Sequence, residues 1–157
     1  MDDIYIGKIV STHGIKGEVK IISDFEYKDK VFVVGNKLII DGDEYNIRSY
    51  RHHKNFEMVT LNEYNDINQV LFLLRKKVYF RKSDLILSDD EILDSELITY
   101  KVLTNTEEEG IIKEIFYGGP NNKIIRIYTD REYLIPYNLV KIDKENKIVH
   151  VEIMEGM

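Results

Sequence analysis

Short runs of apolar residues, many of them alternating with polar ones, recur along the chain and predict a protein built mainly of β-strands. In the first half the predicted strands cover residues 4–10, 18–22, 37–40, 44–50, 55–61 and 77–80. In the second half they cover residues 98–103, 110–117, 123–129, 132–135 and 147–153. The many short strands of the second half predict a small barrel, because closing a sheet removes its exposed edges.

One stretch of the first half has the period of a helix instead. Four apolar residues recur there at a spacing that places them on one face of an α-helix: Ile67, Val70, Leu71 and Leu74. Asp66 precedes this stretch and Gln69 follows three residues later, which is the pattern of a capping box. We therefore predict one helix over residues 66–74.

The composition supports a mainly β protein and narrows the possible chemistry. The sequence contains 23 isoleucines, 12 valines and 11 tyrosines but no alanine, and branched and aromatic side chains favour strands. The absence of cysteine excludes disulfides, thiolate metal sites and a cysteine nucleophile, and it fits a reducing compartment. No apolar run approaches the ~20 residues of a membrane span, and the N-terminus lacks the pattern of a signal peptide. We therefore expect a cytoplasmic protein with no membrane partner.

Charge divides the chain into two parts. The net charge is −6, yet residues 1–88 contain 14 basic against 13 acidic residues, whereas residues 89–157 contain 8 against 15. The acidic stretch 89–96 interrupts the strand pattern, so we predict domains over 1–88 and 97–157 joined by a linker over 89–96. The acidic second domain suits a basic protein partner, because binding to a phosphate backbone depends on lysine and arginine.

No group of residues forms a convincing catalytic or metal site. Ser11 and His13 lie two residues apart, but no spacing connects a carboxylate to them. His52 and His53 are adjacent and face opposite ways on a strand, which does not suit joint binding of a metal ion. We expect no enzyme activity, no cofactor and no metal. A small hydrolase or isomerase that uses His13 remains the alternative from another class.

Two loops of the first half carry basic and glycine residues that suit binding to RNA. The glycines of the loop at 13–17 allow backbone N–H groups to approach a ligand closely. The basic residues of the predicted hairpin tip at 51–54 lie beside Phe56, and cations near aromatic rings can hold phosphates while bases stack. The candidate RNA-binding residues are His13, Gly14, Lys16, Gly17, Arg51, His53 and Lys54.

The order of residues in the segment 6–20 is that of a known signature. Gly7 and Ile9 are followed by His13-Gly14, then by Gly17-Glu18 after two further residues. This pattern resembles the N-terminal signature of the RimM family of bacterial ribosome maturation factors. The second half is similar to the PRC barrel of the same family, through motifs in matching order at residues 117–122, 134–137, 140–143 and 155–157. Family members carry a Tyr-Tyr pair just before this barrel, where this sequence has Ile92 and Leu93.

The resemblance implies a fold and a function. The implied fold is two small β-barrel domains, a translation-factor-like barrel with one helix followed by a PRC barrel. The implied function is that of an accessory factor that binds the free small ribosomal subunit and assists late maturation of its head and processing of 16S rRNA. The resemblance implies that this factor acts by binding rather than catalysis. A PRC-barrel adaptor in RNA metabolism is the alternative among binding proteins.

The resemblance also implies partners. These are ribosomal RNA and the nineteenth small-subunit ribosomal protein, a basic protein of the head, and we expect this chain to act as a monomer. The candidate ribosomal-protein contacts are Ile92, Leu93, Tyr117, Asn121, Asn122 and Tyr137.

Overall fold

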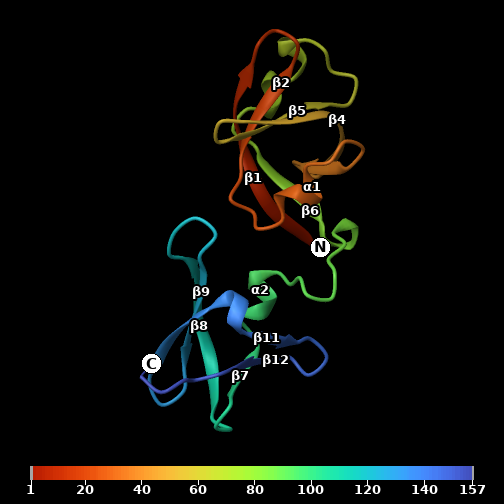
Figure 1. Ribbon diagram of the computed structural model, residues 1–157. Coiled ribbons are helices and arrows are strands. Elements are labelled where there is room, and N and C mark those ends of the chain that lie inside the picture. Colours follow the sequence, from red (N-terminus) through yellow and green to blue (C-terminus); the bar gives the residue numbers. More distant parts are fainter. Residues whose placement is uncertain (1, 157) are drawn as a thin grey trace. The chain divides into compact units, whose positions relative to one another are not determined.

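The computed structural model describes residues 2–156 and divides the chain into two compact units, with the division between Ile86 and Leu87 (Figure 1). The division lies just before the predicted boundary at residue 88. The predicted linker 89–96 is part of the second unit, because Ile92 is buried in the core of that unit.

The first unit is a closed six-stranded barrel. Its strands are β1 (Asp3–His13), β2 (Glu18–Ile22), β3 (Lys37–Ile40), β4 (Asp43–His53), β5 (Phe56–Leu61) and β6 (Lys77–Arg81). They pair in the order β1-β2-β5-β4-β3-β6, and all neighbours are antiparallel. Branched and aromatic side chains fill the barrel and form one core cluster. The short helices are α1 (Lys28–Val31) and the 3₁₀ helices η1 (Ile67–Gln69), η2 (Leu71–Leu73) and η3 (Lys82–Asp84).

The long strand β1 pairs with both β2 and β6, and it changes register at two places. One register shift, against β6, lies between Tyr5 and Gly7, and the other, against β2, lies farther along the strand. A Cβ atom on Gly7 would lie 2.5 Å from the carbonyl oxygen of Ile22 and 2.9 Å from Cγ2 of Ile21. Gly7 therefore allows β1 to approach β2 more closely than any residue with a side chain could.

The prediction of an α-helix over residues 66–74 is correct in its location but wrong in the type of helix. The segment forms the 3₁₀ helices η1 and η2, in which side chains repeat every three residues rather than every 3.6. Val70 and Leu73 are therefore buried, whereas Leu71, which we predicted on the buried face, is 45% exposed. Because side chains repeat every three residues, the face that packs on the core differs from the one that the α-helical period predicted.

The second unit is a curled six-stranded sheet. Its strands are β7 (Lys101–Thr104), β8 (Glu109–Tyr117), β9 (Lys123–Tyr128), β10 (Glu132–Pro136), β11 (Lys141–Asp143) and β12 (Ile148–Val151). They pair in the order β10-β9-β8-β7-β12-β11, with β7 and β12 parallel and the other neighbours antiparallel. The two end strands β10 and β11 are consecutive in the chain and are joined by the 3₁₀ helix η4 (Tyr137–Leu139). This unit and the barrel together confirm the prediction of a mainly β protein.

The second unit begins with a helical turn that the sequence analysis did not predict. The strand expected from Ile98 starts only at Lys101, because the preceding residues form the helix α2 (Asp94–Leu97). Leu97 is fully buried in the core cluster of this unit. Within residues 2–156, no helix is long and apolar enough to cross a membrane.

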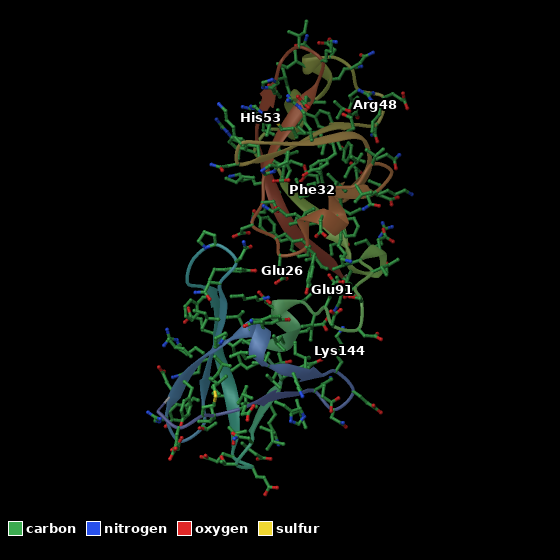
Figure 2. All side chains as sticks on the ribbon, viewed as in Figure 1. Glu26, Phe32, Arg48, His53, Glu91 and Lys144 are labelled. Atoms are coloured by element: carbon green, nitrogen blue, oxygen red, sulfur yellow. The ribbon has the colours of Figure 1, made fainter. Side chains whose placement is uncertain are left out.

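Lys144 holds the first residues of the second unit against its sheet. Its Nζ donates to the carbonyl oxygen of Ser88 at 3.0 Å and also to that of Glu91 (Figure 2). Because backbone atoms accept both hydrogen bonds, the segment 88–91 has a defined path on this unit rather than that of a free linker.

Candidate functional site

The β1–β2 loop places His13 and Glu18 opposite each other, since these residues pair across the two strands. Gly17 adopts a φ of +87°, and a Cβ atom there would lie 3.2 Å from the carbonyl oxygen of Asp66. The backbone N–H of Ile67 also donates to the carbonyl oxygen of Ile15, at 2.9 Å. The start of η1 therefore supports the loop.

The predicted capping box is confirmed and fixes the start of η1. The Asp66 carboxylate accepts the backbone N–H of Asn68. The Oε1 atom of Gln69 accepts the backbone N–H groups of Asn65 and Asp66, at 2.8 and 3.2 Å. These bonds satisfy N–H groups that a helix start leaves unpaired, so the backbone against which Gly17 packs is held in place.

The β4–β5 hairpin brings Arg51 to the β1–β2 loop. The Nε and Nη2 atoms of Arg51 donate to the two carboxylate oxygens of Glu18, each at 2.9 Å. Such a bidentate pair fixes the planes of both groups. The hydrogen bond from Arg51 lowers the pKa of Glu18; burial opposes this shift, and the charge of Arg51 adds to it. Glu18 is therefore an ionised anchor for the hairpin.

The same hairpin places His53 beside His13. The centroids of their rings are 6.4 Å apart, and His53 lies near the end of the hairpin (Figure 2). Burial lowers the pKa of His53, and the nearby cations Arg51 and Lys54 lower it further. The structure thus brings the two predicted RNA-binding loops together at one end of the first unit.

Lys20 is a member of this site that the sequence analysis missed. Its Nζ lies 5.1 Å from the centroid of the Phe56 ring, and its charge contributes to the lowered pKa of His53. Strand alternation could have revealed it, because Lys20 is two residues beyond Glu18 and so shares its face of β2. We call the following residues the tip cluster: His13, Lys20, Arg51, His53 and Lys54.

The tip cluster is suited to bind anions. A hollow of about 360 Å³ beside it is lined by His13, Lys16 and Glu18 among others. Both oxygens of Glu18 accept a hydrogen bond from Arg51, so this carboxylate is held in place beside the hollow. Across the described part of the chain, no group of three histidine, aspartate or glutamate side chains could hold a metal ion. The site therefore presents a set of cations and imidazoles to a ligand.

In the second unit, the β8–β9 turn carries three of the candidate protein contacts. Tyr117 ends β8 and is 59% exposed. Asn121 adopts a φ of 58°, and the backbone N–H of Asn122 donates to the carbonyl oxygen of Gly119 at 3.1 Å. The turn is therefore ordered, and its exposed groups are available for a partner.

Lys123 connects this turn to the rest of the unit. Its Nζ donates to Asp94 of α2 at 2.6 Å and lies 4.3 Å from the centroid of the Tyr137 ring. Burial lowers the pKa of Lys123, but the hydrogen bond and charge of Asp94, with Tyr137 and Tyr117, raise it above its usual value. Tyr117 and Tyr137, distant in the sequence, thus lie around one half-buried ammonium group.

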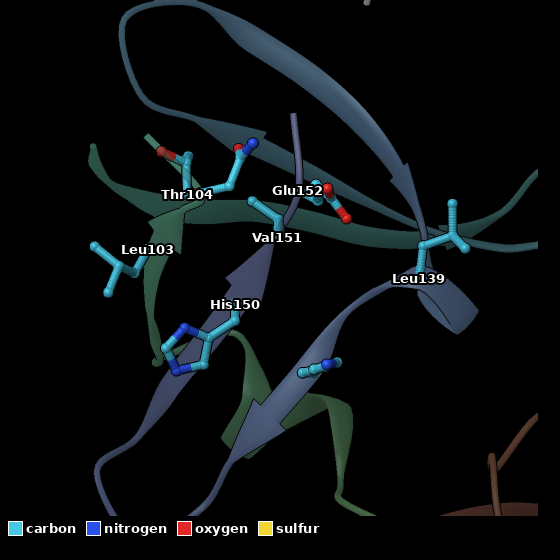
Figure 3. A pocket seen from close by; sticks show the side chains of 8 residues that line it. Leu103, Thr104, Leu139, His150, Val151 and Glu152 are labelled. Carbon is cyan, nitrogen blue, oxygen red and sulfur yellow. The ribbon is translucent and has the colours of Figure 1, made fainter. Parts of the chain in front are cut away.

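The remaining two candidates, Ile92 and Leu93, are only 2% and 6% exposed. Ile92 packs in the core cluster of the second unit, so it cannot contact a partner while that core is closed. A separate hollow of about 210 Å³ is lined by residues of β7, β11, β12 and η4, including Leu139 and His150 (Figure 3). None of the candidate residues lines it.

Comparison with known proteins places the chain in a family. A model of the RimM N-terminal domain matches residues 4–85, which is more than half of the chain. The chain belongs to the RimM family. It is 35% identical to the "Ribosome maturation factor RimM" of Bacillus mycoides strain KBAB4, over 97% of this chain and 96% of that protein. It is equally similar, at 35% identity, to the protein of the same name from Staphylococcus aureus strain MRSA252, over 98% of both chains.

A solved structure shows the same fold as this RimM family member. It is the crystal structure of a 16S ribosomal RNA processing protein RimM from Pseudomonas aeruginosa, with 24% identity and a TM-score of 0.50. The similarity covers 99% of this chain and 100% of that one.

The RimM signature of this chain has a structural basis. Gly7 permits the close approach of β1 to β2, and Gly17 packs against the start of η1. Glu18 binds Arg51 in a bidentate pair, and His13 lies beside His53. Several signature residues therefore build the support of the tip cluster, and His13 belongs to the cluster itself.

We predict that Gly17→Ala destabilises the first unit by about 2 kcal/mol, because it adds both left-handed strain and a contact with the Asp66 backbone. Gly14→Ala is the matched control. Gly14 has a φ of +69°, but no atom lies within 4 Å of the place that a Cβ would occupy, so only the strain of about 1 kcal/mol applies. Urea unfolding measures both. Equal losses would show that the contact with η1 is unimportant.

Proposed function

We propose that this protein is an accessory assembly factor that binds the free small ribosomal subunit and assists late maturation of its head and processing of 16S rRNA. Membership of the RimM family carries the proposal, because the relatives that match over nearly the whole chain are named ribosome maturation factors. We propose a cytoplasmic monomer that acts by binding rather than by catalysis.

The first unit is the proposed RNA-binding part. Its tip cluster combines Arg51, Lys54 and Lys20 with two imidazoles, and the ring of Phe56 lies beside Lys20. Such groups bind phosphates and stack on bases. The exposed β1–β2 loop adds Lys16 and the backbone N–H groups next to Gly14. The bidentate bond between Arg51 and Glu18 orders the hairpin before RNA arrives, which reduces the entropy lost on binding.

The second unit is the proposed protein-binding part. It is acidic, and a basic protein such as the nineteenth small-subunit ribosomal protein is its proposed partner. The β8–β9 turn, with Tyr117, Asn121 and Asn122, offers an exposed aromatic ring and two amides beside Tyr137. Charge complementarity would orient the partner, and the ring would supply contact area.

The proposed mechanism requires no chemical step. A factor that binds a head arrangement leading to the native state more tightly than misfolded arrangements shifts the population toward the productive arrangement. Release follows when the mature head offers fewer contacts, since an equilibrium moves only by the difference in affinity between its states.

Co-sedimentation tests the proposal. We expect the purified chain to sediment with free small subunits and not with whole ribosomes, and its affinity to fall as salt rises, because cations contact phosphates. An affinity that does not vary with salt would remove the electrostatic part of the proposal. Failure to bind free small subunits at low salt would contradict the function itself.

The pH dependence of RNA binding provides a separate prediction. The pKa of His53 is lowered by burial and by nearby cations, so a bound phosphate favours its protonated form, and the complex takes up a proton. Affinity for a short RNA hairpin should therefore rise about threefold as the pH falls from about 7.5 to 6. His53→Gln should flatten this profile, whereas the control His150→Gln in the second unit should not. An unchanged slope in His53→Gln would contradict the role of this imidazole.

A further inference from the structure

The first unit has a second cavity, on the other face of the β4–β5 hairpin from the tip cluster. His52 and His53 are adjacent on β4; His53 lies beside His13, whereas His52 contacts Glu57. His52 lines a pocket of about 730 Å³ together with residues of β1, β2 and the segment that follows β2. This volume lies in the range of small-molecule sites, and such sites occur at the mouths of β-barrels.

The polar side of this pocket rests on a buried carboxylate. Glu57 is 2% exposed and accepts hydrogen bonds from the Tyr50 hydroxyl at 2.6 Å and from His52 Nδ1 at 3.0 Å. Lys28 Nζ lies 3.8 Å from it and donates to the carbonyl oxygen of Ser23 at 3.2 Å. Burial, with the bond to Glu57, raises the pKa of Tyr50 to about 12, so the phenol stays protonated and remains a donor.

The network determines what the pocket offers to a ligand. A carboxylate can only accept, so the Nδ1 atom of His52 carries the proton and donates to Glu57, which leaves its Nε2 atom as an acceptor toward the pocket. Lys28 is held in place by two acceptors. Lys54 also lines the pocket, and it forms no ion pair with any residue that the structure describes. Lys28 and Lys54 are therefore the side chains of this pocket that can bind an anion.

The other side of the pocket is apolar with one carboxylate. Tyr5 and Ile22 line it, and each is 48% exposed. Tyr79 contacts the Tyr5 ring in an edge-on arrangement, with centroids 5.7 Å apart, and limits its movement. Asp24 adds an acceptor to the lining. Cations, an aromatic surface and one carboxylate match the phosphate, base and ribose hydroxyl of a nucleotide.

We infer that this pocket binds one nucleotide of a single-stranded RNA segment. Its phosphate lies at Lys28 and Lys54, its base on Tyr5 and Ile22, and a ribose hydroxyl at Asp24. This inference rests on the proposed function, since it takes RNA as the ligand of the first unit. Lys54 belongs to both the pocket and the tip cluster, so one RNA strand can contact both without a gap.

Fluorescence anisotropy with the full chain and a labelled single-stranded RNA hexanucleotide tests the inference. Ile22→Glu should weaken binding about tenfold, because it replaces the apolar surface under the base by a charge. Lys28→Gln should weaken it about threefold. The matched controls are Val34→Glu, which changes an exposed valine outside the pocket, and Lys37→Gln; both should remain within about twofold of the wild type.

Two further arms define the ligand. Asp24→Ala should bring the affinities for RNA and DNA hexanucleotides closer together, since only RNA carries the 2′-hydroxyl. Unlabelled AMP should compete only at much higher concentration than the hexanucleotide. Tighter binding of AMP than of RNA would assign the pocket to free nucleotides and overturn the RNA assignment. Stronger competition by an acidic peptide than by RNA would assign the pocket to a protein and overturn it as well.

Backbone amide chemical shifts of the wild type keep the test independent of variant stability. On titration with the hexanucleotide, shifts at Lys28, His52 and Asn55 support the pocket, and shifts confined to residues 13–17 overturn it. If the pocket shows no shifts while the chain still sediments with free small subunits, the inference fails and the proposed function stands. If both fail, the proposed function fails with it.

Discussion

Reversing the charges of Arg51 and Lys54 to glutamate should weaken binding to free small subunits about a hundredfold at low salt. Each change removes a cation from the tip cluster and adds repulsion toward phosphate. The salt dependence should also become shallower, by about two in the slope of log affinity against log salt. A salt series of co-sedimentation experiments with the double variant measures both quantities.

The double variant needs a control of equal charge change. Lys37→Glu with Lys77→Glu alters two exposed lysines of the same unit outside the tip cluster, and it should lose far less affinity. Binding of the nineteenth small-subunit ribosomal protein alone should be unaffected by the tip variant. If contacts to RNA and to this protein weaken together, the proposed division of labour between the units is wrong.

Gly7→Ala should destabilise the first unit by about 3 kcal/mol. The new Cβ would lie 2.5 Å from the carbonyl oxygen of Ile22, and this backbone atom cannot move without shifting β2 in the closed barrel. Urea unfolding, followed by hydrogen exchange of amides in each unit, should show the loss in residues up to 86 and not beyond.

Two companion variants test whether the backbone clash causes this loss of stability. Gly7→Ala combined with Ile21→Val should recover little stability, because the shortened side chain relieves only the contact of 2.9 Å and not the one with the backbone. Gly110→Ala places a Cβ against the carbonyl oxygen of Tyr128 and should destabilise the second unit instead. Full recovery in the first double variant would refute the backbone clash.

Most strands could be predicted because their signal is local. The short apolar stretches at residues 18–22 and 37–40 predicted β2 and β3 with their observed bounds. The 3₁₀ form of η1 and η2 could not be predicted, since apolar residues at 67, 70, 71 and 74 fit an α-helix as well. Packing favours a side-chain period of three residues, which buries Leu73 rather than Leu71. Likewise, Ile98 suits a strand, but Leu97 is buried as part of α2, so the strand begins only at Lys101.

The candidate RNA site was found as two separate loops, and its physical organisation came from contacts across the barrel. The bond between Arg51 and Glu18 spans 33 positions of the sequence, and no spacing rule connects them. Lys20 was overlooked because a single lysine on a strand normally indicates only a solvated face. The pocket beside Glu57 could not be predicted either, since its lining comes from β1, β2, the segment after β2, α1 and the β4–β5 hairpin.

By itself, the sequence determined the strand-rich class, the acidic second half and the identity of the chemical groups, because periodicity, charge and residue type are properties of the chain alone. Tertiary structure decided which of these groups meet. Closure of the barrel joined the two basic loops and buried Glu57, because pairing of distant strands depends on the packing of the whole barrel interior rather than on any local pattern.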